Sequence, residues 1–314
     1  MLKFCLLAAA LMAVMPPLFA RETVMPAFDR EQPPGNLYDV GGYRLHIHCR
    51  GSGSPAVIFD AGLGGFSMDW LFVQQQLPND IRSCSYDRAG YGWSESGTAP
   101  RATDHITEEL EILLAAAQVE PPYVLVGHSF GAFNMEYFAV TNADDVAALL
   151  LVEGSHPDQS ERLPDLPARA QRLSRGTLVT QFDPSVLYRH FPESMWYVMA
   201  GLMTAGKAIA AQQWELVNFN VSAAQVKAAG RLPPVPLVVI SRGRRVWPQT
   251  PLGDALEKTW SELQAELVAS IPGGRQVFAR NSGHLVHLDE PALVAEEIRR
   301  LVDTARRRPA ATSP

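Results

Sequence analysis

The sequence predicts an α/β fold, in which a mostly parallel β-sheet is flanked by helices and carries an inserted helical cap. Three observations support this class. Two extended runs near the N-terminal end surround a Gly-Gly pair, short apolar runs then alternate with helical patterns, and one aromatic-rich stretch interrupts that alternation. Repeated strand–helix units imply parallel strands joined by helical crossovers, which place helices on both faces of the sheet.

The N-terminal end has the pattern of a secretory signal peptide over residues 1–20. Lys3 is followed by an apolar run from Phe4 to Met15, and a small residue ends the segment. The run is short for a membrane span, and the Pro pair at 16–17 interrupts any helix that would lengthen it. Leu18 fits the small-x-small cleavage rule poorly, so an uncleaved anchor in contact with a membrane is the alternative.

The composition is that of a globular protein without a nucleic-acid partner. Of the 314 residues, 47% are hydrophobic and 19% are charged, and the formal net charge is −6. Cleavage after residue 20 would remove Lys3 and leave 26 basic against 33 acidic residues, a charge of −7. No basic stripe is present to neutralise phosphates, and no Gly-rich dinucleotide or phosphate loop occurs. We expect a periplasmic or secreted protein.

The strands and helices are predicted in order along the chain. Residues 37–40 and 43–49 flank Gly41-Gly42, which is typical of a β-hairpin. Six apolar runs are predicted as strands, at 56–59, 81–86, 123–126, 147–152, 237–240 and 276–279. Five segments are predicted as helices, at 70–77, 103–119, 130–140, 251–269 and 291–306.

The alternation of strands and helices stops between Pro157 and Leu232. This stretch is helical in pattern and rich in aromatic residues, namely Phe182, Tyr188, Phe191, Trp196, Tyr197, Trp214 and Phe219. We interpret it as a cap. The predicted organisation is therefore a signal peptide (1–20), the first part of the core (37–154), the cap (155–232) and the second part of the core (233–308).

The segment with the clearest chemistry is Gly127-His128-Ser129-Phe130-Gly131, which follows an apolar strand and precedes a helical pattern. The turn in such a segment is so tight that side chains at both flanking positions would collide, hence the two glycines. It projects the serine hydroxyl above the sheet edge and aims a helix N-terminus at it. The alternative is a strand-to-helix turn with a capping serine. We favour Ser129 as a nucleophile.

With this segment the chain resembles the α/β-hydrolase family, from about residue 37 to the end of the last helix. Three further segments carry the resemblance: Asp60-Ala61-Gly62-Leu63-Gly64-Gly65 after the third strand, Asp87-Arg88-Ala89-Gly90-Tyr91-Gly92-Trp93-Ser94 after the fourth, and Asn281-Ser282-Gly283-His284 after the last. The resemblance implies an eight-stranded sheet and a serine hydrolase. Dehalogenase and epoxide-hydrolase chemistries are disfavoured, because those relatives use Asp where this chain has Ser129.

A serine hydroxyl is a weak nucleophile at neutral pH, so a base must accept its proton. Among eight histidines, His284 alone combines a preceding Gly, a late position and a preceding strand. We expect His287 to be a packing or surface residue. We expect His128 to be structural and to point away from the serine.

The resemblance also implies an oxyanion hole of two backbone N–H groups, from Phe130 and from Leu63. The sequence departs from the family at Ala61, where His is usual, so the support of this loop must differ. Asp60 is interpreted as an ion-pair partner inside the fold, with an influence on substrate choice as the alternative.

The catalytic acid has three candidates in the sequence. Most relatives carry it after the seventh strand, but residues 241–251 contain no carboxylate, and Asp254 is the first that follows. Glu153 directly follows the sixth strand, where some relatives, certain haloalkane dehalogenases among them, place the acid. It lies 24 residues after Ser129, which accommodates one helix and one strand. We favour Glu153, then Asp254, then Asp158.

Cys49 and Cys84 are expected to form a disulfide. Cys5 lies in the signal peptide, and a pair left in an oxidising compartment is usually bonded. In α/β-hydrolases the second and fourth strands are antiparallel neighbours, which would bring the two residues together. Two buried thiols are the alternative.

These features predict hydrolysis of a small apolar ester through an acyl-Ser129 intermediate, which is resolved by water activated at His284. No metal or organic cofactor is implied. An amide or peptide hydrolase of the same fold, similar to an iminopeptidase, is a rival, but it would need an acidic patch that the sequence does not locate. A binding or sensing protein without turnover is the rival outside enzymes.

Overall fold

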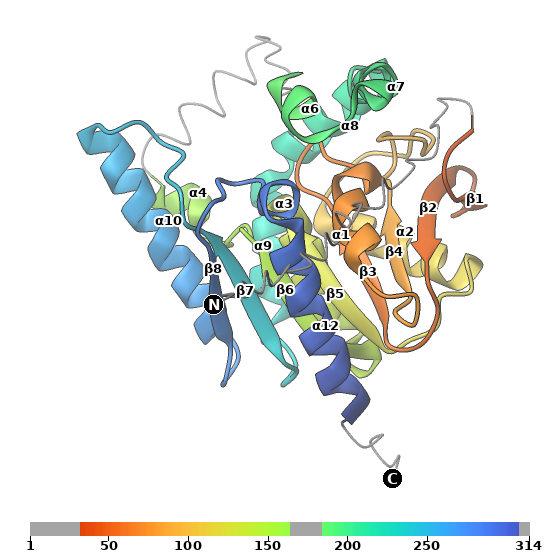
Figure 1. Ribbon diagram of the computed structural model, residues 1–314. Coiled ribbons are helices and arrows are strands. Elements are labelled where there is room, and N and C mark those ends of the chain that lie inside the picture. The colour runs from red at the N-terminus through yellow and green to blue at the C-terminus, as the bar shows by residue number, and fades with distance from the viewer. Residues whose placement is uncertain (1–31, 164–183, 308–314) are drawn as a thin grey trace, which may run out of the picture.

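The computed structural model describes residues 32–163 and 184–307 (Figure 1). The predicted signal peptide and part of the predicted cap, Phe182 included, lie outside the described residues. In the part of the chain that is described, no helix has the length and apolar character needed to cross a membrane.

Eight strands form one mixed sheet in the order β1-β2-β4-β3-β5-β6-β7-β8, which confirms the predicted fold class. Only β1/β2 and β2/β4 pair antiparallel, and the remaining pairs are parallel. The strands are β1 (Asn36–Asp39), β2 (Arg44–Arg50), β3 (Ala56–Asp60), β4 (Ser83–Tyr86), β5 (Tyr123–His128), β6 (Val146–Val152), β7 (Leu237–Arg242) and β8 (Arg275–Ala279).

Helices cover both faces of this sheet (Figure 1). One face packs on α2 (Thr103–Ala116), α3 (Phe130–Thr141) and α10 (Pro251–Ala269). The other packs on η1 (Ser67–Trp70), α1 (Leu71–Gln76), α11 (Val286–Asp289) and α12 (Pro291–Arg307). Successive residues of a strand serve opposite faces: Ile58 belongs to the first core cluster, and Val57 and Phe59 to the second. The central strands β3, β5, β6 and β7 are therefore largely apolar.

The described parts of the segment between β6 and β7 contain helices joined by loops and no strand. It contains α4 (Gln159–Arg162), α6 (Pro184–His190), α7 (Glu193–Met203), α8 (Gly206–Val217) and α9 (Phe219–Ala229), and the short η2 (Ala143–Asp145) precedes β6. Residues of α7 and α8 share an apolar cluster with Phe66 and Tyr91 of the core, and α9 packs against α3. Figure 1 shows α6, α7 and α8 together beyond the end of the sheet where the parallel strands finish.

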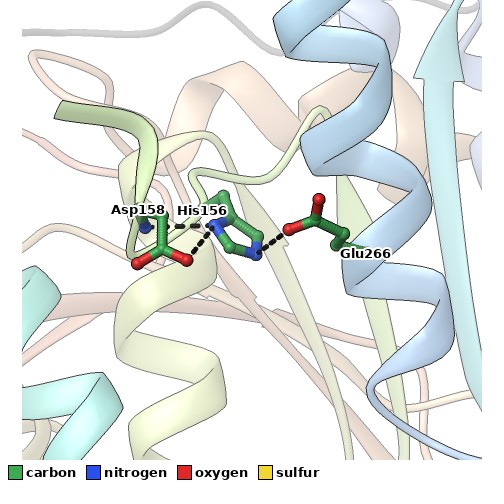
Figure 2. A group of neighbouring side chains, drawn as sticks. All are labelled: His156, Asp158 and Glu266. Carbon is green, nitrogen blue, oxygen red and sulfur yellow. Dashed lines mark hydrogen bonds and ion pairs between the residues drawn. The ribbon is translucent and has the colours of Figure 1, made fainter. Parts of the chain in front are cut away.

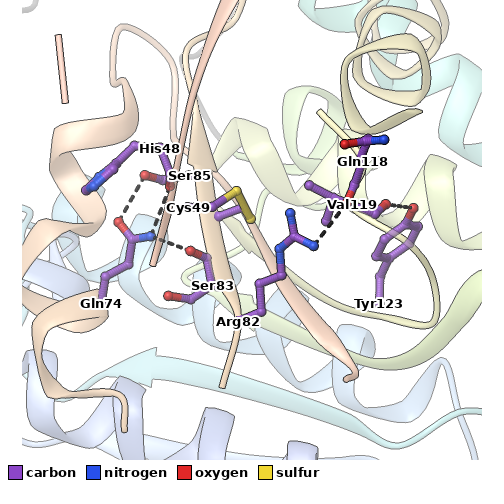
Figure 3. Close-up of a disulfide and its surroundings, with 10 residues drawn as sticks. His48, Cys49, Gln74, Arg82, Ser83, Ser85, Gln118, Val119 and Tyr123 are labelled. Atoms are coloured by element: carbon purple, nitrogen blue, oxygen red, sulfur yellow. Dashed lines mark hydrogen bonds between the residues drawn. A yellow bond between two sulfur atoms is a disulfide. The ribbon is translucent and has the colours of Figure 1, made fainter. Parts of the chain in front are cut away.

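The expected disulfide between Cys49 and Cys84 is present in the structure (Figure 3). The two residues are direct partners in the antiparallel β2/β4 pair, with their Cα atoms 4.0 Å apart. Beside them, the Gln74 side chain from α1 donates to the Ser83 carbonyl and accepts from the Ser85 hydroxyl. The disulfide and this amide together hold β2, β4 and α1 in register.

Candidate active site

Ser129 occupies a strained turn between β5 and α3. Its φ is 49° and its ψ is −119°, a region that residues other than glycine rarely adopt. Its N–H donates to the Val152 carbonyl, and its own carbonyl accepts from the N–H of Ser155, so the segment after β6 holds it in place. A Cβ at Gly127 would lie 2.7 Å from the Ala132 Cα, and one at Gly131 would lie 2.6 Å from the Ala61 oxygen. Both flanking positions therefore require glycine.

Glu153 and His284 meet beside this turn. Glu153 directly follows β6 and is fully buried, and it also has a positive φ of 49°. His284 lies in the loop between β8 and α11, and its Nδ1 is 3.2 Å from Glu153 Oε2. The Ser129 hydroxyl and the His284 ring line one pocket but make no direct hydrogen bond with each other. Such bonds often tighten only when a substrate binds.

The Glu153 carboxylate is held by further donors. The Arg242 backbone N–H donates to Oε1 at 2.8 Å, and Oε2 accepts from Trp260 Nε1 at 3.1 Å and pairs with Arg242 Nη1. Burial alone would raise the pKa of Glu153, but the hydrogen bond and charge of His284 and the charge of Arg242 hold it below its ordinary value. Glu153 is therefore an ionised carboxylate at neutral pH.

The other two carboxylates considered for this role lie elsewhere. Asp254, on α10, is largely exposed and pairs with Arg245 at 2.7 Å. Asp158 pairs with Lys227. Of the three candidates, the structure brings only Glu153 to His284.

Arg242 and Trp260 were not singled out by the sequence. The Arg242 guanidinium also pairs with Glu257 at 3.0 Å and lies 4.7 Å and 5.2 Å from the ring centroids of Trp247 and Trp260. A usable signal was present, since Arg242 is the first charged residue after the apolar run of β7, and β7 pairs with β6, the strand that directly precedes Glu153.

His128 departs from the expectation that it points away from the serine. Its ring lines the same pocket, lies 4.8 Å from the His284 ring, and has Nε2 2.9 Å from the His284 carbonyl. The ring fits there because Gly62 has no side chain. A Cβ added at Gly62 would be 2.8 Å from His128 Nδ1. His287 is a buried packing residue, as expected, against Trp70 and His128. Burial, aided by the neighbouring histidines, lowers the pKa of His287 to about 3 and that of His128 well below its ordinary value.

The loop after β3 lies against the nucleophile turn. An added Cβ at Gly62 would be 3.2 Å from Ser129 Cβ, and Leu63 and Phe130 line the pocket with Ser129. Asp60 at the end of β3 is fully buried and pairs with Arg88, as the preferred interpretation expected.

The pocket is a cavity of about 500 Å³ at the end of the sheet where the parallel strands finish. Its apolar lining consists of Leu63, Phe130, Leu163, Phe219, Val246, Trp247, Trp260 and Leu285. Its polar lining consists of His128, Ser129, Ser155, Gln159, Arg242 and His284. No carboxylate is among the described residues that line it.

One cluster outside the pocket has the composition of a metal site. Ligand atoms of His156, Asp158 and Glu266 lie within 4.8 Å of one another (Figure 2). However, Asp158 pairs with Lys227, Glu266 pairs with Arg162 at 2.6 Å, and His156 Nδ1 accepts the Asp158 N–H. Because these groups have protein partners, we interpret the cluster as ion pairs that join the segment after β6 to α9 and α10.

Comparison with known proteins gives consistent matches. A sequence model described as "Alpha/beta hydrolase family" matches residues 47–297. The uncharacterized protein YqjL of Bacillus subtilis is 28% identical over 259 residues, which cover 82% of this chain and 87% of that protein. The chain also matches part of one longer protein, with 90% of this chain aligned to 44% of that protein.

Two solved structures illustrate the fold. A thermophilic esterase from Thermogutta terrifontis superposes with a TM-score of 0.64 at 19% identity, over 86% of this chain and 98% of that one. The epoxide hydrolase CorEH superposes with a TM-score of 0.61 at 18% identity, over the same shares of the two chains. At these identities the likeness shows the fold alone.

Proposed function

Since the chain belongs to the alpha/beta hydrolase family, we propose that it is a serine hydrolase that cleaves carboxylic esters. One observation carries the proposal: Ser129, with its strained backbone, shares a pocket with His284, and the Nδ1 atom of His284 faces the buried carboxylate of Glu153. Strain of this kind persists only where the surrounding structure enforces it, and it concentrates at functional sites.

The arrangement supports a two-step acyl transfer. Glu153 accepts the Nδ1–H of His284, which leaves Nε2 free to take the hydroxyl proton as Ser129 Oγ attacks the ester carbonyl. The oxyanion that forms would accept the N–H groups of Phe130 and Leu63. Collapse breaks the bond to the alcohol oxygen, which receives the proton from His284. Water then attacks the acyl-Ser129 ester with His284 again as base, and releases the acid.

The lining of the pocket favours an apolar, uncharged ester. Much of its lining is aromatic or aliphatic, including Phe219 from the cap and Trp247 and Leu285 from the core loops. The described lining has no carboxylate to pair with a substrate amine, which argues against an aminopeptidase-like activity. Epoxide opening in relatives of this fold uses Asp at the position of Ser129, and we therefore do not propose it.

Export is part of the proposal. The disulfide between Cys49 and Cys84 is compatible with an oxidising compartment, either periplasmic or extracellular.

Hydrolysis of p-nitrophenyl esters of graded acyl length tests the proposal. We expect turnover by the purified protein that Ser129→Ala reduces to background while its melting temperature is retained. Ser261→Ala, on the outer part of α10 away from the pocket lining, is the matched control and should keep full activity. Activity retained in Ser129→Ala would refute the assignment, and p-nitroanilide turnover above ester turnover would favour an amide hydrolase.

A further inference from the structure

Arg88 is a buried arginine outside the pocket whose hydrogen bonds converge on the loop after β3. A guanidinium has five N–H donors, and all five are used. Nε and Nη2 donate to the two carboxylate oxygens of Glu215, at 2.8 Å and 3.1 Å. Nη1 donates to Asp60 Oδ1 at 2.5 Å and to the Ala61 carbonyl at 2.7 Å, and Nη2 donates to the Gly62 carbonyl at 2.9 Å.

These contacts fix the direction of the N–H groups in the loop. The Gly62 carbonyl and the Leu63 N–H belong to one planar trans peptide unit and point in opposite directions. Because Arg88 holds the carbonyl on one side, the Leu63 N–H is directed to the other. Ser129 lies close to this peptide unit, since a Cβ added at Gly62 would be 3.2 Å from Ser129 Cβ and Leu63 lines the pocket with Ser129.

The same arginine connects the loop to two other parts of the site. Asp60 also accepts from the side-chain amide of Asn134 on α3, the helix that starts after Ser129. Glu215 lies on α8 of the cap, is fully buried, and also accepts from the Tyr91 hydroxyl. Loop, nucleophile helix and cap therefore share one network of ion pairs and hydrogen bonds, and its cap member, Glu215, is not part of the pocket lining.

We propose that Arg88 is a positioning residue that holds the oxyanion donor of Leu63, and that Glu215 makes this position depend on the cap. The inference rests on the proposed serine hydrolase function. It also explains how the loop tolerates Ala61 where relatives have His, because Arg88 supplies the loop's support through backbone carbonyls. A lysine in place of Arg88 keeps the charge but has three donors, so it cannot hold both carbonyls and both carboxylates.

The test compares Arg88→Lys with a second buried arginine. Arg101 is paired with both oxygens of Glu109 and makes no contact with the loop, so Arg101→Lys is the matched control. Removing one oxyanion donor typically costs about 10²–10³ in kcat. We expect Arg88→Lys to lower kcat about 10²-fold and to change KM by less than about threefold. The affinity for a trifluoromethyl ketone, which mimics the tetrahedral intermediate, should fall by the same factor as kcat/KM. Arg101→Lys should lower the melting temperature and leave kcat unchanged.

Glu215→Gln keeps the proposal open to test even if Arg88→Lys does not fold. It retains the shape of the side chain, lies outside the pocket lining, and disturbs one of the bonds to Arg88, so we expect a smaller fall in kcat, about tenfold, at constant KM. The proposal is overturned if a folded Arg88→Lys or Glu215→Gln keeps wild-type kcat and inhibitor affinity, or if only KM changes. Failure of the serine hydrolase assignment would be seen separately, as activity that survives Ser129→Ala.

Discussion

Glu153→Gln is the most informative substitution for the role of the acid. In the native protein Oε2 receives three donors, at 3.2 Å from His284, 3.1 Å from Trp260 and 2.5 Å from Arg242, and Oε1 receives the Arg242 backbone N–H at 2.8 Å. Because both oxygens of Glu153 accept hydrogen bonds, the NH₂ group of a glutamine would face a donor whichever way the amide is turned. It also removes the negative charge that would stabilise the imidazolium and leaves Arg242 with one carboxylate fewer.

From loss of both the charge and the correct tautomer we expect kcat/KM to fall about 10³–10⁴-fold, which corresponds to about 4–5.5 kcal/mol of transition-state stabilisation. The assay is steady-state hydrolysis of a p-nitrophenyl ester, with circular dichroism and a melting curve to show that the variant is folded. Asp254→Asn, which alters an exposed ion pair on α10, is the control and should change kcat/KM less than twofold. A folded Glu153→Gln within tenfold of wild type, or a large loss in Asp254→Asn, would refute the assignment of the acid.

Two further predictions concern stability. The double variant Cys49→Ser/Cys84→Ala removes a cross-link that spans 35 residues. In denaturant unfolding we expect its free energy of unfolding to be about 3–4 kcal/mol below that of the oxidised wild type, with ester turnover retained below the new melting temperature. Equal stability of wild type and variant would contradict this prediction. Burial alone would lower the pKa of His46, but Asp87 at 2.9 Å and the Pro34 carbonyl raise that pKa above 6.5. The stability that protonated His46 contributes is therefore complete below about pH 6.5, and it is lost as the pH rises through the pKa of His46 in the folded protein. Urea unfolding should therefore show a greater loss between pH 6 and pH 9 for wild type than for His46→Gln, and parallel pH profiles would exclude this contribution.

The fold was accessible from the sequence because its signals are local. The apolar runs of β3, β5, β6 and β7 are buried on both faces, so each reads as an uninterrupted stretch, and the glycines around Ser129 follow from one tight turn. The predicted strand at 237–240 stops short of β7, which continues through Ser241 and Arg242. That polar extension is buried only because Glu153 and Glu257 neutralise the guanidinium.

The interactions that complete the site join residues far apart in the chain, and periodicity carries no information about them. Arg242 lies 89 residues from Glu153, and Arg88 lies 127 residues from Glu215. Arg88 was visible only as part of a motif, and its acceptors could not be identified before the chain was folded. The place of His128 differs from the prediction for a related reason, since it depends on the missing side chain of Gly62 in a different loop.

The central claim, that Ser129 is an activated nucleophile, is tested most directly by the intact mass and peptide map of the protein after reaction with a fluorophosphonate. The account predicts one adduct per chain, located on Ser129 and not on Ser155 beside it in the pocket, absent from Ser129→Ala and formed far more slowly in His284→Ala. A folded protein that is not labelled, or an adduct that maps to any other residue, would contradict it.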